Sequence, residues 1–284
     1  MAVPALADDD AAADGCAGQY GVERGTGRRR VRIGVQLAQY DAEYSAIRRA
    51  AAIAEDMGVD VLFNWDHFFP PGNGSDGPHF ECWTMLAAWA ESTCRVQIGP
   101  LVSCNSYRNP ELLADMARTV DHISGGRLIL GIGAGFKQRD YTEYGYEFGT
   151  SGSRLADLAQ SLVRIEARFA RLNPAPTRKI PVLIGGGGEK VTLRIVAEHA
   201  DIWHTFAQGD AFAGKTRVLE QHCARIGRDP DDIERSVLVG GHPDQVADPL
   251  RETGATLFVL LTSGPDFDLA ALPEWLAWRD RQNA

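Results

Sequence analysis

Short apolar segments alternate with amphipathic segments eight times after residue 30, and this alternation constrains the fold more than any other feature. Most of the apolar segments are continuous runs of Val, Ile and Leu, as expected for parallel strands that are covered on both faces. Eight βα units in about 250 residues match the size of a closed barrel, so we predict an α/β fold of the (β/α)8, or TIM-barrel, type. An open doubly wound sheet is the alternative, because the number of strands alone does not exclude it. The predicted strands are Val31–Leu37, Val59–Asn64, Val96–Ser103, Leu128–Ile132, Ile180–Ile184, Asp201–Phe206, Ser236–Val239 and Thr256–Leu261.

The segments between the strands carry helix signals. Asn109, Pro110 and Glu111 supply an N-cap, a proline at the first helical position and an acid in the first turn. The longest irregular stretches, Trp65–Phe80 and Phe136–Gly152, each follow a strand, and in a barrel they would lie at the catalytic face. The other predicted helices are Tyr44–Met57, Glu81–Glu91, Ser153–Arg171, Lys190–Glu198, Asp210–Ile226, Pro243–Glu252 and Leu269–Arg279.

Charge and cysteine content narrow the class of protein. A formal net charge of -9 argues against a protein that coats nucleic acid or an anionic membrane. No window approaches about 18 uninterrupted apolar residues, so we predict no transmembrane helix. The five cysteines show no paired spacing, which indicates free thiols in a reducing cytoplasm.

The first thirty residues differ from the rest in composition. They are rich in Ala, Asp and Gly, and the acids 8–10 precede the arginines 28–30, which is the reverse of a signal peptide. We predict that residues 1–30 are a disordered tail, or an extension added by an upstream start codon. Residues 31–284 are then one barrel domain.

An acid and a histidine follow the second predicted strand, within Phe63–Pro70. Asp66 and His67 would project into the barrel mouth, where a histidine changes protonation near neutral pH. The alternative is a pair that only caps the loop.

A run of four glycines, Gly185 to Gly188, follows the fifth predicted strand and precedes a helix. Glycines let backbone N–H groups face a ligand, and a helix N-terminus adds partial positive charge, so this loop predicts an anion site. A merely flexible loop is the alternative. The glycines in Gly131–Gly135 do not satisfy the dinucleotide fingerprint G-x-G-x-x-G, which makes a Rossmann interpretation weak.

Other chemistries lack their motifs. The seven histidines form no H-E-x-x-H pattern, and no cysteine pair has zinc-site spacing, so we predict no metal site. No G-x-S-x-G nucleophile elbow is present.

Together with the polar loop Val102–Pro110, these motifs resemble the luciferase-like monooxygenase superfamily. Within it, they are most similar to the deazaflavin (coenzyme F420)-dependent oxidoreductases of actinobacteria. The resemblance runs from Val31 to the C-terminus. Its most specific stretches are Phe63–Phe69, Phe80–Met85, Leu101–Pro110, Asp121–Gly135 and Pro181–Lys190.

The resemblance implies a cofactor site. Asp66 and His67 would hydrogen-bond the cofactor ring and face the substrate. The third strand would carry a non-prolyl cis peptide behind the ring, and later loops would hold the ribityl chain and phosphate. The matching positions are Leu101, Val102 and Ser103 for the cis peptide, Gly133, Ala134 and Lys137 beside the ribityl chain and phosphate, and Gly185, Gly186, Gly187 and Gly188 for the phosphate.

The implied activity is hydride transfer between coenzyme F420 and an unidentified small organic substrate, with His67 as the catalytic residue that stabilises charge on the ring or delivers a proton. His79, Trp83 and the stretch Phe136–Gly152 would line the substrate pocket. Ala134 stands where related sugar-phosphate dehydrogenases carry a glutamate, which argues against sugar-phosphate oxidation. One alternative is an FMN-dependent monooxygenase that uses O2, and another is a non-catalytic barrel that binds a phosphorylated ligand. Because homodimers are common in the family that the chain resembles, the resemblance also implies a homodimer.

Overall fold

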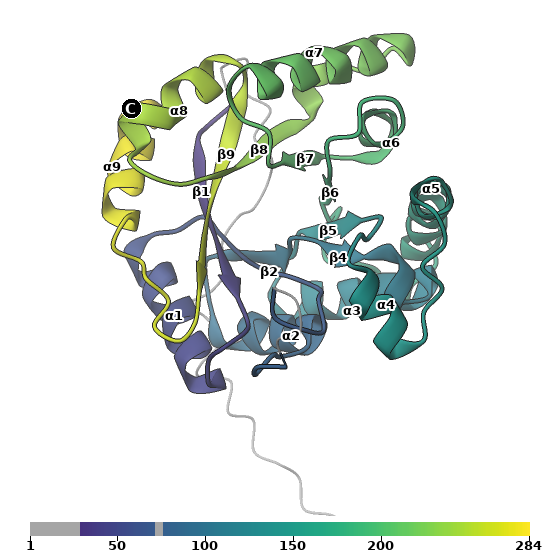
Figure 1. Cartoon of the computed structure of the whole chain (residues 1–284), viewed down its shortest axis with the longest axis horizontal. Helices are drawn as coiled ribbons and strands as arrows, with labels where there is room; N and C mark the ends of the chain where they lie inside the picture. Colours follow the sequence, from purple (N-terminus) through teal and green to yellow (C-terminus); the bar gives the residue numbers. More distant parts are fainter. Residues whose placement is uncertain (1–28, 72–75) are drawn as a thin grey trace, which may run out of the picture.

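The computed structural model describes residues 29–71 and 76–284, and in this part of the chain parallel strands form a barrel inside a ring of helices (Figure 1). The strand order is β3-β2-β1-β9-β8-β7-β6-β5-β4. The strands are β1 (Arg32–Ala38), β2 (Val61–Asn64), β3 (Gln97–Pro100), β4 (Ser103–Cys104), β5 (Leu130–Gly133), β6 (Val182–Gly185), β7 (Ile202–Thr205), β8 (Glu234–Val239) and β9 (Ala255–Ser263).

The barrel closes between β3 and β5. Strands β3 and β4 are the two halves of the predicted strand Val96–Ser103, which is interrupted at a cis peptide between Leu101 and Val102. The amide of Ile129 donates to the carbonyl of Ile98 (2.8 Å), which joins β3 to the segment that leads into β5. The (β/α)8 prediction is therefore confirmed, and the open doubly wound sheet is wrong.

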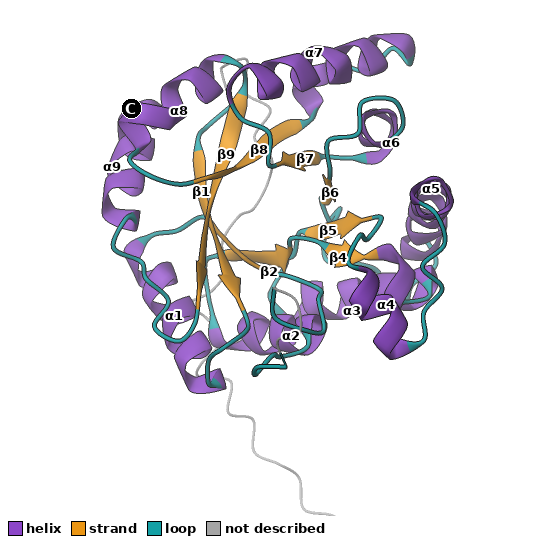
Figure 2. Cartoon of the chain, viewed as in Figure 1, coloured by secondary structure: helices purple, strands orange, loops and turns teal. Residues whose placement is uncertain are grey.

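Helices cover the outside of the strands (Figure 2). Outward side chains of the strands pack with the helices into a large apolar core, because strand side chains alternate between the two faces. The inward side chains form a smaller apolar cluster inside the barrel, which includes Phe63, Ile129 and Ile202. The helices are α1 (Tyr44–Met57), α2 (Cys82–Ser92), α3 (Pro110–Ile123), α4 (Gln138–Tyr144), α5 (Ser151–Phe169), α6 (Thr192–His199), α7 (Gly209–Arg225), α8 (Pro243–Glu252) and α9 (Leu272–Asn283).

Two of the differences between the predicted and the observed helices concern the chain that follows β5 and β6. Helix α4 lies within the stretch Phe136–Gly152, where we expected irregular chain, and it ends at Gly145 in the left-handed conformation. Only Asp140 and Tyr141 of its seven residues are buried, so it has no apolar stripe that sequence periodicity could reveal. The helix expected from Lys190 begins at Thr192, after a turn.

Both ends of the domain meet at the start of β1. The amide of Val31 donates to Asn283 Oδ1 (2.8 Å), and Asn283 Nδ2 donates to the carbonyl of Val31 (2.9 Å). The predicted tail, residues 1–30, lies outside the described residues except for Arg29 and Arg30. No helix of the described ranges has the length and apolar character needed to cross a membrane.

Candidate functional site

His67 follows β2 and pairs with an acid that the sequence analysis did not identify. Its Nδ1 lies 2.7 Å from Oδ2 of Asp140 on α4, and the same oxygen accepts from the Tyr107 hydroxyl (3.1 Å). Burial alone would raise the pKa of Asp140, but the hydrogen bond and charge of His67 and the charge of Lys137 bring this pKa below its ordinary value. An ionised carboxylate only accepts hydrogen bonds, so Nδ1 of His67 carries the proton of this bond.

The other ring nitrogen of His67 is available for chemistry. The side chain is 19% exposed, and no described residue hydrogen-bonds to its Nε2. Asp140 therefore orients the imidazole through Nδ1 and leaves Nε2 without a partner among the described residues.

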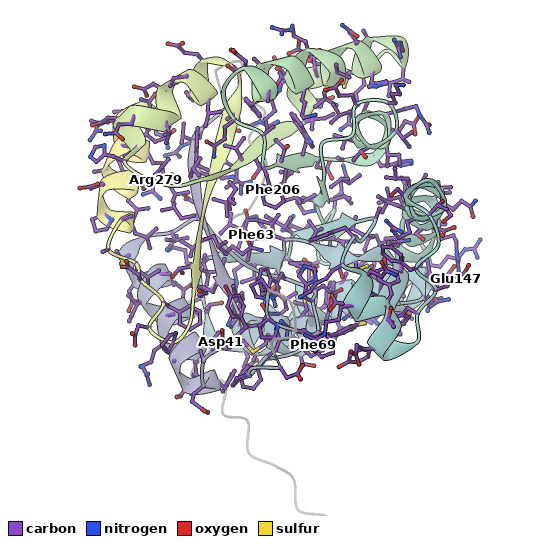
Figure 3. The ribbon with its side chains drawn as sticks, viewed as in Figure 1. Asp41, Phe63, Phe69, Glu147, Phe206 and Arg279 are labelled. Atoms are coloured by element: carbon purple, nitrogen blue, oxygen red, sulfur yellow. The ribbon has the colours of Figure 1, made fainter. Side chains whose placement is uncertain are left out.

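Aromatic rings surround His67. Trp65 and Phe136 contact it edge-on, with ring centroids 5.3 Å and 5.5 Å away. Phe136 and Phe206, which follow β5 and β7, are 74% and 73% exposed. Figure 3 places the labelled Phe206 and Phe63 within the ring of strands. The C-terminal ends of the strands therefore present an aromatic mouth.

His79 is half-buried and contacts Trp65, one of the rings of this mouth. Burial, followed by the positive charges of His67 and Lys137, lowers the pKa of His79 to about 4. The neutral imidazole accepts at Nε2 from the indole N–H of Trp65 (3.0 Å). His79 therefore fixes the orientation of Trp65, and its expected place in the substrate pocket stays a prediction.

Asp66 has contacts that differ from the expected ones. Its buried carboxylate accepts from the Ser103 hydroxyl (2.9 Å), the Cys104 amide (3.0 Å) and both terminal nitrogens of Arg108, which also pairs with Glu81 (2.7 Å). Asp66 therefore ties the loop after β2 to β4, and its expected contact with the cofactor ring stays a prediction.

Trp83 also differs from expectation. It is buried in the outer core, and its indole N–H donates to the Ser103 hydroxyl (3.0 Å). Its burial argues against the substrate-pocket role that we expected, and Trp83 supports the Ser103–Asp66 contact from behind.

The Leu101–Val102 peptide is cis, as the resemblance implied. Leu101 N–H donates to the carbonyl of Asn64 (2.7 Å), and Gln36 donates to the carbonyl of Leu101 (2.9 Å). A Cβ on Gly133 or Gly185 would come within 2.7 Å or 3.0 Å of the Val102 methyls. The glycines at the ends of β5 and β6 therefore make room for Val102, which forms a floor at the barrel mouth.

The glycine loop continues from β6. Gly186 has a φ of 137°, which strongly favours glycine, and no described group accepts a hydrogen bond from the amides of Gly187 or Gly188. The carbonyl of Gly188 accepts from the Leu193 amide (2.9 Å), so the loop stays attached to the first turn of α6. These open amides are the donors that an anionic group requires.

Lys215 on α7 supports this loop and was missed from the sequence. Its Nζ donates to the carbonyl of Gly187 (2.7 Å) and lies 3.3 Å from a carboxylate oxygen of Glu189. A lysine inside a later helix carries no sequence signal that links it to the glycine run.

Lys137 is placed differently from the expected position beside the phosphate. Its Nζ donates to the carbonyls of Phe69 and Pro70, each at 2.9 Å, and burial lowers its pKa. Lys137 therefore holds the loop after β2, while Ala134 is half-buried and accepts a long hydrogen bond from Tyr141 (3.4 Å). The described residues contain no group of three or more His, Cys, Asp or Glu that could hold a metal ion.

Comparisons with known proteins give relatives of this chain. A putative coenzyme F420-dependent oxidoreductase of Mycobacterium tuberculosis is 29% identical over 234 residues, which are 72% of this chain and 64% of that protein. An F420-dependent glucose-6-phosphate dehydrogenase of Amycolatopsis mediterranei is 31% identical over 159 residues, which are 50% of this chain and 47% of that protein. The chain thus spans less than two thirds of the length of these two relatives.

Solved structures share the fold. An F420-dependent secondary alcohol dehydrogenase, in complex with an F420-acetone adduct, has a TM-score of 0.73 at 16% identity, over 86% of this chain and 99% of that one. The sequence model described as luciferase-like monooxygenase matches residues 29–258, which is most of the chain. The chain therefore belongs to the luciferase-like monooxygenase family.

Proposed function

We propose that this protein is an oxidoreductase that transfers a hydride between the deazaflavin coenzyme F420 and a small organic substrate. The observation that carries the proposal is the His67–Asp140 pair. Asp140 binds Nδ1 of His67, and Nε2 has no partner among the described residues, beside the aromatic mouth at the C-terminal ends of the strands. The names of the two curated relatives and of the solved alcohol dehydrogenase, all F420-dependent, support the choice of cofactor.

The described residues fit such a cofactor. The Val102 floor would lie against the flat ring, and exposed Phe136 and Phe206 would lose apolar surface to it. The open amides of Gly187 and Gly188 would bind the phosphate, with the Lys215 ammonium close by.

When bound, the cofactor would accept or supply the hydride. Residues of the protein would transfer the proton that accompanies the hydride. In substrate oxidation, Nε2 of His67 accepts the proton that the substrate loses, and the ionised Asp140 stabilises the resulting imidazolium through Nδ1. In substrate reduction, the same nitrogen returns the proton.

The substrate would lie against the aromatic mouth beside His67. Lys137 is already bound to two backbone carbonyls, so it is poorly placed to bind an anionic substrate. An uncharged substrate suits this mouth better than a sugar phosphate, in agreement with the presence of Ala134.

Titrations with F420 and with FMN, followed by a substrate screen, test the proposal. We expect micromolar affinity for F420, and we expect His67→Ala to lower turnover at least about 100-fold while the cofactor affinity stays within a few fold. Binding of FMN alone would favour the monooxygenase alternative, and tight binding without turnover on any substrate would favour the non-catalytic one. Homodimer formation and a cytoplasmic location stay predictions.

A further inference from the structure

His204 lies on the inner side of the barrel beside the glycine loop. Ile202, two residues earlier on β7, belongs to the interior cluster, whereas Trp203 between them packs outward in the large core. His204 is in register with Gly185 on β6, and its carbonyl accepts from the Gly186 amide (3.0 Å). The imidazole is thus next to the strand end from which the glycine loop begins.

One nitrogen of this imidazole has no partner. Nδ1 lies 2.8 Å from the hydroxyl of Ser236 on β8, while Nε2 is buried and bonds to no group in residues 29–71 and 76–284. The whole residue is 3% exposed, and Phe206 at the mouth contacts the imidazole edge-on at 5.6 Å. Buried polar atoms in folded proteins nearly always have a partner, so a ligand at this position would explain the exception.

The chemistry of the imidazole restricts that ligand. Burial lowers the pKa of His204 to about 3, so the ring is neutral and one nitrogen donates while the other accepts. The Ser236 hydroxyl pairs with either tautomer, and it therefore leaves Nε2 as either a donor or an acceptor. A ligand hydroxyl satisfies both cases, whereas a ring carbonyl or an ionised phosphate oxygen can only accept.

The position of His204 indicates which part of the cofactor it would contact. The ring would lie towards His67 after β2, and the phosphate would lie at the amides of Gly187 and Gly188. The part between them is a polyhydroxylated chain, and His204 is beside Gly185, where the loop to those amides starts. We propose that Nε2 of His204 binds a hydroxyl of the cofactor's ribityl chain; this inference rests on the proposed function and adds a binding residue to its site.

Two probes separate this role from a general effect on the pocket. The first is 5-deazaflavin mononucleotide, and the second is its analogue in which hydrogens replace the chain hydroxyls. Dissociation constants are measured by fluorescence titration for the wild type, for His204→Leu and for His204→Asn. We expect the wild type to bind the hydroxylated probe about tenfold more tightly than the deoxy probe.

The variants then give a specific pattern. His204→Leu should weaken binding of the hydroxylated probe about tenfold and leave the deoxy probe nearly unchanged, because the lost partner is absent from that probe. His204→Asn, which retains a donor and an acceptor, should recover part of the preference. Ser236→Ala is the matched control, since it removes the Nδ1 partner and leaves Nε2 in place, and it should keep most of the preference.

Equal affinity of the wild type for the two probes would overturn the inference and leave the proposed function standing. An equal loss on both probes in His204→Leu would also overturn it, because that result indicates a change in the shape of the pocket. Binding of neither probe by the wild type would also overturn this inference, and absence of F420 binding in the same titration would remove the proposed function as well. The wild-type comparison needs no variant, so the inference remains testable even if His204→Leu fails to fold.

Discussion

Replacing Asp140 by Asn tests the pairing at the centre of the site. The substitution keeps the shape of the side chain and removes its charge. The His67 Nδ1–Asp140 Oδ2 distance of 2.7 Å and the full burial of the acid indicate a charge-assisted hydrogen bond, worth about 1.5–3 kcal/mol to the protonated imidazole. Since about 1.4 kcal/mol corresponds to a tenfold change in rate, turnover should fall about 10- to 100-fold.

Single-turnover hydride transfer, followed by the absorbance of the deazaflavin, measures this effect directly. Cofactor affinity should change little, because Asp140 lies behind His67 and away from the mouth. Tyr107→Phe is the control, since it removes the 3.1 Å hydrogen bond to the same carboxylate and leaves the His67–Asp140 pair intact. Loss of that neutral donor should cost less than about tenfold. Single-turnover rates within about twofold of wild type in a folded Asp140→Asn protein would refute the role of the pair.

Three further results follow from the structure. Lys215→Met should weaken F420 binding about tenfold and leave the affinity for the deazaflavin without its phosphate unchanged. Lys179→Met makes the same change of charge near the N-terminal end of β6, and it should alter the affinity for neither ligand. Gly133→Ala places a Cβ 2.7 Å from a methyl of Val102 and should lower the free energy of unfolding, measured in denaturant titrations, by about 1–3 kcal/mol. Gly214→Ala on α7 is the control, because its Cβ meets nothing within 4 Å and should not destabilise the protein. The free energy of unfolding should fall as the pH drops from 6.5 towards 3, because the unfolded chain binds protons at His204 and His79 that the folded protein, with pKa values of about 3 and about 4 there, does not bind. Each of the two histidines contributes up to about 1.4 kcal/mol per pH unit, so His204→Leu should reduce the slope and leave the part due to His79, and an unchanged curve would contradict the assignment.

The barrel and its strand ends could be predicted from the sequence because their signals are local. Hydrophobic runs located the strands, and the rule that parallel strands present functional loops at their C-terminal ends placed His67 and the glycine run on one face. The cis peptide at Leu101 came from the family resemblance, since no residue pattern in the chain specifies it.

The partners of these residues could not be predicted. Asp140 comes from a seven-residue helix without an apolar stripe, and it reaches His67 across 73 positions of sequence. Asp66 pairs with Arg108 because β2 lies beside the strand that β3 and β4 form together, and this side-chain pairing has no signal in the spacing of the two residues. Lys137 was expected beside the phosphate, but its ammonium bonds to the carbonyls of Phe69 and Pro70, because the direction of a long flexible side chain depends on the groups that surround it in the fold.

Helix α4 lies outside the regular alternation of strand and helix, yet it supplies the acid behind His67. Its buried Tyr141 hydrogen-bonds Ser106 and contacts Cys104 of β4, so a change in the length of this helix would also disturb the chain that follows β4. A barrel without Gln138–Tyr144 would lack the acid of the pair, and the imidazole that follows its second strand would need another partner to fix its orientation.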